Sequence, residues 1–262
     1  MERRSLLMLG GLAGAGLVTG CGANGGLTGD RRQRATCVPR SALDPHRTLG
    51  DLALVYEVSQ SRSRFFFDPS FFDQLQSWLG FYRSTAGNGD LDQAWTYGSW
   101  IDGGAGCDSW HHAGRAFDIA RLRRSDRTFV SCRYDQWQRL SGSELEAARR
   151  GYWQLAASLH LCFASVLTYL YNQAHANHIH VDNGRSGNEL SVFSTRSRVQ
   201  VQAVQAICSY LFDAPVEITG RWDAATRQAS SAVLDRVGLS GRLTSGSDSW
   251  HGFLRAAVLP AG

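Results

Sequence analysis

The apolar positions in the first half of the chain follow two different periods. Over residues 69–82 they recur every three to four residues, which predicts a helix that faces the core, and Asp68 followed by proline provides an N-cap and a first helical residue. Residues 95–101 form a short strand candidate. Over residues 116–120 the period is two, which predicts that Asp118 lies on a strand.

Helical periodicity returns in the middle of the chain. Residues 143–146 (Ser-Glu-Leu-Glu) have the pattern of a capping box, and apolar residues at helical spacing continue to Leu170, which predicts a helix of about seven turns. His160 lies off this apolar stripe, so we expect it to be solvated. A period of two then places Ile179 and Val181 on one face of a strand, and the opposite face carries His178, His180 and Asp182.

The last part of the chain has a different character. Residues 198–259 contain three apolar stripes at helical spacing and no strand signal, and the Ser- and Gly-containing segment 183–197 is expected to be a linker before them. The patterns together predict an α+β protein. A small antiparallel sheet with packed helices would occupy residues 46–190, and a small all-α three-helix domain would occupy residues 198–259.

Composition and charge exclude some classes of function. The chain has 262 residues, 43% of them apolar and 19% charged, which is sufficient to bury a globular core. Its formal net charge is only +4 and its arginines are scattered, so we expect no nucleic-acid partner. No feature of the sequence indicates a partner protein.

The N-terminal segment has the form of an export signal. Within residues 1–20, two arginines precede an apolar run over residues 6–18 that is too short to span a bilayer. Residues 18–21 (Val-Thr-Gly-Cys) resemble the bacterial lipobox, which implies lipidation of Cys21 and anchoring of an extracytoplasmic protein to a bacterial membrane. Residues 21–45 are expected to form a flexible tether. Whether export follows the general or the twin-arginine route stays open.

Five further cysteines follow the lipobox. Outside the cytoplasm we expect one or two disulfides among them with an odd thiol left over, and the sequence does not specify which cysteines pair. Small buried hydrophobic residues are the alternative interpretation. No C-x-x-C spacing is present, which argues against a cysteine zinc site; the five are Cys37, Cys107, Cys132, Cys162 and Cys208.

Histidines and aspartates gather in two stretches. His111 precedes Asp118 by seven residues across Gly114, and His178 and His180 flank an isoleucine on the second predicted strand. The glycine permits a close approach of the backbone, so His111 can lie beside Asp118. Two imidazoles and one carboxylate suit zinc, and three protein ligands leave a fourth position open. We therefore predict a zinc site.

The motifs also resemble a known group of enzymes. Residues 109–118 match the S-x-H-x-x-G-x-A-x-D motif of the zinc D-Ala-D-Ala carboxypeptidase and endopeptidase group, and residues 178–180 match its H-x-H motif. The pattern between them looks most like the bacterial extensin-like domain, a relative of that group. The resemblance spans roughly residues 37–190 and implies a zinc peptidase that cleaves peptidoglycan stem or crosslink peptides.

The resemblance assigns roles to individual residues. It implies that His111, Asp118 and His180 bind Zn²⁺ and that His178 or His175 is the catalytic acid or base. Ser109 and Asp182 would orient the metal ligands. Asn177 departs from the group's pattern, because several members carry an acidic general base at that position. The alternative function is therefore a non-catalytic, peptidoglycan-binding lipoprotein with a degenerate peptidase fold.

The C-terminal region carries a second resemblance. Residues 201–205, 220–226 and 250–254 are similar to the helix starts and aromatic positions of the peptidoglycan-binding helical module. This resemblance implies peptidoglycan as a partner of residues 198–259. A plain three-helix accessory domain is the alternative, because aromatic residues at helical spacing also form cores.

Overall fold

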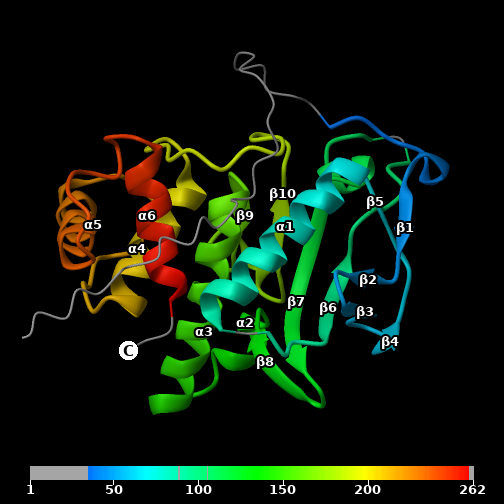
Figure 1. Ribbon diagram of the computed structural model, residues 1–262, viewed down its shortest axis with the longest axis horizontal. Helices are drawn as coiled ribbons and strands as arrows, with labels where there is room; N and C mark the ends of the chain where they lie inside the picture. Colours follow the sequence, from blue (N-terminus) through cyan, green and yellow to red (C-terminus); the bar gives the residue numbers. More distant parts are fainter. Residues whose placement is uncertain (1–34, 88, 105, 260–262) are drawn as a thin grey trace, which may run out of the picture.

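The structure is a computed structural model that describes residues 35–87, 89–104 and 106–259 (Figure 1). The predicted signal segment, the predicted lipidation site Cys21 and most of the predicted tether lie outside the described residues. The first regular elements are a 3₁₀ turn, η1 (Arg40–Ala42), and strand β1 (Asp44–His46), so ordered structure begins inside the range expected to be a tether.

An eight-stranded sheet forms the centre of the molecule. Its path runs β2, β3, β6, β7, β10, β9, with β4 paired to β3 and β8 paired to β7, while β1 pairs only with β5. The bounds are β2 Thr48–Leu49, β3 Leu52–Tyr56, β4 Ser61–Arg62, β5 Phe65–Phe67, β6 Gln93–Gly98, β7 Ala116–Arg124, β8 Arg127–Ser131, β9 Ser165–Leu167 and β10 Ile179–Asp182.

The expected α+β class is confirmed, but the sheet is larger than expected and not wholly antiparallel. Strands β3 and β6 are parallel neighbours, and every other pair in the sheet is antiparallel. The two strands are parallel because helix α1 (Pro69–Ala86) lies between them in the sequence and carries the chain back to the end of the sheet at which β3 begins. Asp68 caps α1 as predicted, since its Oδ1 accepts a hydrogen bond from the Phe71 amide at 3.0 Å.

The long central helix differs from its prediction at both ends. Helix α3 (Gly142–Cys162) follows the short α2 (Tyr134–Trp137), and it begins one residue after Ser141, so the capping box predicted at residue 143 is wrong. The helix ends where Phe163 becomes extended, and Val166 belongs to strand β9. Val166 is fully buried, so buried apolar residues continue at helical spacing beyond the point where the helix itself ends.

The prediction that His160 is solvated is also wrong. His160 is completely buried, its ring centroid lies 6.3 Å from that of Trp250, and neither ring nitrogen has a hydrogen-bond partner among the described residues. Burial lowers the pKa of His160 to about 3. The prediction failed because two sides of α3 are covered. Helix α1 and the sheet pack on one side of α3, and the C-terminal helices pack on the other side.

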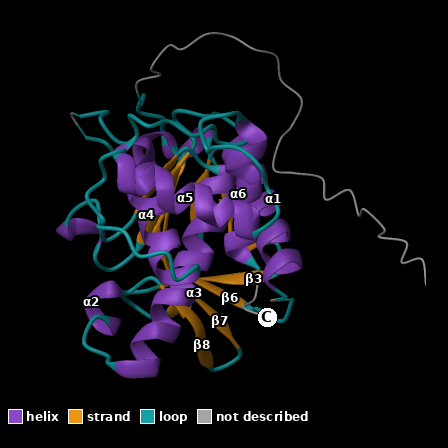
Figure 2. Ribbon diagram, turned by 90° about the vertical axis from the view of Figure 1, so that its left-hand side faces the viewer, coloured by secondary structure: helices purple, strands orange, loops and turns teal. Residues whose placement is uncertain are grey.

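Three helices form in the C-terminal region where the apolar stripes predicted them. They are α4 (Arg198–Leu211), α5 (Ala224–Arg236) and α6 (Ser247–Val258). Helices α4 and α6 pack on α3, and their buried residues join the sheet's buried residues in one continuous hydrophobic cluster (Figure 2). Within the described part of the chain, none of the helices combines the length and the apolar character of a membrane span.

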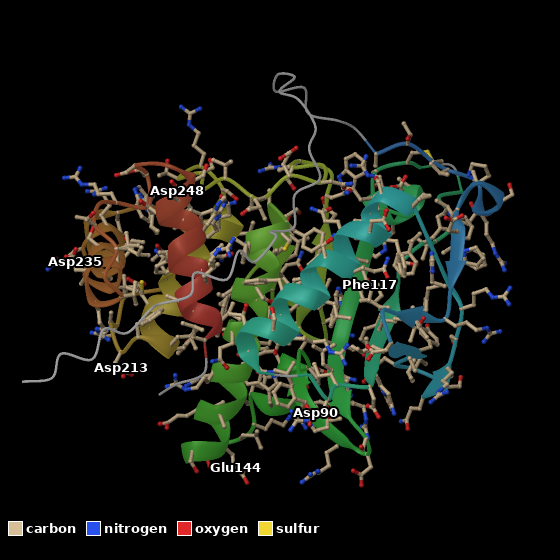
Figure 3. All side chains as sticks on the ribbon, in the orientation of Figure 1. Asp90, Phe117, Glu144, Asp213, Asp235 and Asp248 are labelled. Carbon is tan, nitrogen blue, oxygen red and sulfur yellow. A yellow bond between two sulfur atoms is a disulfide. The ribbon has the colours of Figure 1, made fainter. Side chains whose placement is uncertain are left out.

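The sheet has one face toward this core and one face away from it. Phe117 on β7 and Ile179 and Val181 on β10 are fully buried members of the cluster, and Figure 3 labels Phe117 beside α1. Side chains alternate along a strand, so the intervening residues Asp118 and His180 project from the opposite face. That opposite face carries the candidate site.

Candidate metal centre

Asp118 and His180 occupy the middle of the site because their strands are neighbours. Strands β7 and β10 pair antiparallel, and in their register His180 lies directly opposite Asp118. The two side chains therefore emerge side by side from one face of the sheet. The Asp118 backbone is held further by Thr96 on β6, whose hydroxyl donates to the Asp118 carbonyl at 2.6 Å.

His111 reaches the site from a short turn. The 3₁₀ segment η2 (Trp110–Ala113) precedes β7, and the Ser109 hydroxyl accepts a hydrogen bond from the His111 amide at 3.3 Å. Gly114 ends the turn with φ +66°, and a Cβ there would lie 2.8 Å from a methyl group of Leu43. The positive φ favours glycine here, and the Asp68 backbone nitrogen, 3.0 Å from such a Cβ, leaves little room for a side chain, which explains the central glycine of the motif.

The three predicted ligands converge. The Asp118 Oδ1 atom lies 2.9 Å from His180 Nδ1 and 3.3 Å from His111 Nε2, and the two ring nitrogens are 3.1 Å apart. Together these residues form a group of three that can present one ligand atom each to a metal ion. His111 and Asp118 are partly buried and His180 is buried, so the site is shielded without being closed.

The outer hydrogen bonds of the two rings fix which nitrogen faces inward. The Nδ1 atom of His111 donates to the Ser99 carbonyl, and Nε2 of His180 donates to Asp182 Oδ2 at 3.3 Å. When neutral, each ring therefore turns a lone pair toward Asp118, and a ring that gains a proton carries it on this same nitrogen and donates it to Asp118. Two lone pairs and a carboxylate directed at one point favour a cation between them.

The electrostatics of the site agree with this preference for positive charge. Burial by itself raises the pKa of Asp118, but hydrogen bonds with His111 and His180 outweigh it and leave that pKa well below its ordinary value. Burial by itself lowers the pKa of His180, but Asp118 and Asp182 on either side raise it to about 9. The negative charge of Asp118 and Asp182 therefore favours both a proton on His180 and a metal ion beside it, and the two compete for binding.

His178 lies beside the converging atoms. Its Nε2 is 3.5 Å from Asp118 Oδ1, and its Nδ1 donates to the Asn177 side-chain carbonyl at 2.6 Å. Burial lowers the pKa of His178; Asp118 opposes this shift, and His180 and His111, when they carry a proton, add to it. The ring thus has a lone pair on Nε2 next to the metal position, where it can accept a proton.

His175 lies farther from the ligand atoms. Its ring centroid is 5.1 Å from that of His178 and 6.0 Å from that of His180, and its Nδ1 donates to the Asn172 side-chain carbonyl at 2.6 Å. Burial, followed by the neighbouring His178 and His180, lowers its pKa to about 4. Of the two predicted catalytic histidines, His178 is the better placed.

The sequence did not specify three features of the site. Ser99 orients His111 through a backbone carbonyl, so its side chain carries no sequence signal for this role. Tyr97 places its ring 5.8 Å from that of His178, from the strand next to β7. A disulfide between Cys37 and Cys107 holds the segment before β1 against the loop that leads to His111.

The disulfide confirms that cysteines of this chain pair, and it gives one pairing that the sequence left open. Backbone contacts reinforce the link, because the Val38 amide donates to the His112 carbonyl at 2.9 Å and the Trp100 indole donates to the Val38 carbonyl at 3.0 Å. Cys132 and Cys208 are free thiols, and both are buried.

Comparison of the chain with models of known protein families, with curated proteins and with solved structures finds no match. The fold and the site by themselves define an α+β protein with a His–Asp–His cluster whose ligand atoms lie close enough together that they could hold a metal ion. The motif resemblance to zinc peptidases stays a hypothesis.

Proposed function

We propose that the protein is a zinc-dependent hydrolase of peptidoglycan stem or crosslink peptides, of the D,D-peptidase type, anchored as a lipoprotein in a bacterial cell envelope. The observation that carries the proposal is the convergence of His111 Nε2, Asp118 Oδ1 and His180 Nδ1, which lie between 2.9 and 3.3 Å from one another. These atoms come from three separate elements that the fold brings together.

The spacing of the three atoms fits zinc. Ligand atoms at 2.0–2.1 Å from a tetrahedral zinc ion are about 3.3 Å from one another. The observed separations of 2.9, 3.1 and 3.3 Å need only small adjustments to reach that value. Two imidazole nitrogens and one carboxylate oxygen also leave a fourth position for catalysis, as in hydrolytic zinc enzymes.

The remaining residues have separate tasks in the proposed reaction. When bound, zinc supplies the Lewis acidity that peptide hydrolysis needs. His178 would accept a proton at Nε2 from the attacking water and pass it to the amine that leaves when the peptide C–N bond breaks, in the role that an acidic residue fills in several enzymes of the group that the motifs resemble. Asn177 holds His178 by accepting its Nδ1–H, so the amide is suited to positioning that base. Asp182 and Ser109 keep His180 and His111 oriented.

The substrate and the location follow from the motifs of the chain. The S-x-H-x-x-G-x-A-x-D and H-x-H patterns are similar to those of peptidases that act on peptidoglycan, and residues 18–21 resemble a lipobox. The proposed partners are peptidoglycan and, through a lipid on Cys21, the membrane; no nucleic acid is proposed. Residues 198–259 would hold the protein on peptidoglycan and so keep substrate at high local concentration.

The test is digestion of purified peptidoglycan by the full chain, with and without a chelator, followed by mass analysis of the released fragments. We expect peptide fragments that disappear with the chelator and return when zinc is added back. The variant His180→Ala should release nothing. His251→Gln is the matched control, because His251 bonds to the Ser191 carbonyl far from the site in the C-terminal helices.

Two outcomes would redirect the proposal. Zinc bound in stoichiometric amount without any release of fragments would favour the non-catalytic peptidoglycan-binding alternative, for which the amide at Asn177 is the supporting observation. Equal release by wild type and His180→Ala would show that the cluster is not the active site.

A further inference from the structure

A cavity lies among the C-terminal helices, and none of the metal-centre residues line it. Its volume is about 280 Å³. Its lining comes from the segment before helix α5, from that helix and from the turn before α6. The polar and aromatic lining residues include Trp222, Arg227, Gln228, Ser231, Arg242 and Thr244. We call this feature the α5 cleft.

Buried hydrogen bonds fix one wall of the α5 cleft. The Gln205 side chain, fully buried on α4, donates to the Arg221 carbonyl at 3.1 Å and to the Thr226 hydroxyl at 2.9 Å, and accepts from the Gly220 amide at 2.8 Å. These bonds hold the segment on both sides of Trp222. The indole also packs on Phe193, with ring centroids 5.0 Å apart. Trp222 is therefore positioned before any ligand arrives.

The opposite wall is a tight turn. The Ser245 amide donates to the Arg242 carbonyl at 2.8 Å, and the Arg242 amide donates to the Ser245 hydroxyl at 3.1 Å. Leu243, in the same turn, is only 2% exposed and anchors it in the core. The Arg242 side chain is thus carried by a rigid backbone while its guanidinium stays exposed.

The α5 cleft carries unneutralised positive charge. Arg227 and Arg242 are both exposed, and neither makes an ion pair with any acid in the described part of the chain. Asp223 interacts electrostatically with Arg227, but it also caps α5 by accepting hydrogen bonds from both the amide and the hydroxyl of Thr226 at 2.8 Å. The charge of the two guanidinium groups is therefore not balanced by an ion pair within the described part of the chain.

We propose that the α5 cleft binds carboxylate groups of a short peptide, and that Trp222 covers the peptide's aliphatic part. A guanidinium matches a carboxylate with two parallel hydrogen bonds, and the hydroxyls of Ser231 and Thr244 suit peptide amides. The volume admits a fragment of a few residues rather than a folded domain. The identification of this peptide as a peptidoglycan stem peptide, which is rich in carboxylates, rests on the proposed function. The proposal that the cleft binds carboxylate groups does not depend on that function.

The test is a binding experiment that does not depend on hydrolysis. The full chain carrying His180→Ala is titrated into a fluorescently labelled disaccharide–tetrapeptide from peptidoglycan, and anisotropy is recorded. We expect Arg227→Gln and Arg242→Gln each to weaken binding about tenfold or more, because each removes a charged hydrogen-bonding partner. Arg139→Gln, at an exposed arginine after α2, is the matched control and should bind as the parent does.

Further arms separate the possible ligands. A tetrapeptide with amidated carboxyls should bind about tenfold more weakly or worse, and the disaccharide without peptide should not compete. Unchanged affinity in both arginine variants, in protein whose thermal melting is also unchanged, overturns the proposal, and so does equal binding of the amidated peptide. Polyphosphate that competes as well as the tetrapeptide reassigns the cleft to phosphate. Binding that persists when digestion has failed upholds the cleft and refutes only the proposed reaction.

Discussion

Asp118 Oδ1 lies 2.9 Å from His180 Nδ1, and the two residues are direct partners across the ladder of β7 and β10. The contact therefore depends on backbone pairing in the middle of a sheet and not on a loop. His111 is added from a turn that a glycine, a serine cap and a disulfide constrain. Rigid placement of this kind is what a metal centre needs to keep its geometry.

The first prediction concerns the residue behind His180. Asp182 accepts from His180 Nε2 and so directs the Nδ1 lone pair toward the metal. Asp182→Asn, whose amide can present either a donor or an acceptor, should lower zinc affinity by about 10- to 100-fold. Competition with a fluorescent chelator measures this. Asp135→Asn, in an ion pair with Arg133, is a control expected to bind zinc like wild type. Unaltered affinity in Asp182→Asn would show that Asp182 does not orient the ligand.

The second prediction separates metal binding from proton transfer. His178→Ala should keep stoichiometric zinc but lower kcat for fragment release by about 10²- to 10⁴-fold, because it removes the proposed general base. His175→Ala should have a smaller effect, since its ring is farther from the ligands. Asn177→Ala should lie between them, because it frees the ring that Asn177 holds. Larger loss in His175→Ala than in His178→Ala would reverse the assignment.

The third prediction concerns the Cys37–Cys107 disulfide. The bond joins residues 70 apart in sequence, and removing it with Cys37→Ser and Cys107→Ser should lower the free energy of unfolding by about 2 to 4 kcal/mol. The loop before His111 is released as well, so zinc affinity should fall. Urea denaturation and zinc titration measure the two effects. Wild-type zinc affinity in the double variant would show that the disulfide does not support the metal centre.

The fourth prediction concerns pH and His160. Burial lowers the pKa of His160 to about 3 in the folded protein, against 6.5 for an exposed histidine. Between these two values the unfolded chain binds the additional proton, so this residue makes stability fall as the pH drops from 6.5 toward 3. The slope is at most about 1.4 kcal/mol per pH unit.

The variant His160→Leu isolates this effect. It removes the titration and also two buried nitrogens that lack partners in the described structure, so it should be neutral or stabilising at pH 7 and more stabilising at pH 4.5. Urea denaturation at several pH values gives the difference in unfolding free energy between variant and wild type. A difference that does not change with pH would mean that His160 is not buried in its neutral form. Other acid-sensitive groups cancel in this comparison.

The sequence by itself determined the local features of this protein. Period and capping predicted α1, with Asp68 at its start, and the alternation around Asp118 and His180 predicted strands whose polar faces carry the ligands. The glycine of the motif predicted a turn that brings His111 to the strand. These features depend on neighbours a few residues apart, so a pattern in the chain is enough to reveal them.

Only the tertiary structure decided which surfaces meet. The C-terminal helices cover the side of α3 that the pattern left polar, and this contact buried His160. Crossover through α1 made β3 and β6 parallel, and the sheet register set Asp118 opposite His180. The carbonyl of Ser99 and the pairing of Cys37 with Cys107 likewise depend on residues far apart in sequence. Such contacts depend on how whole elements pack, which no local period encodes.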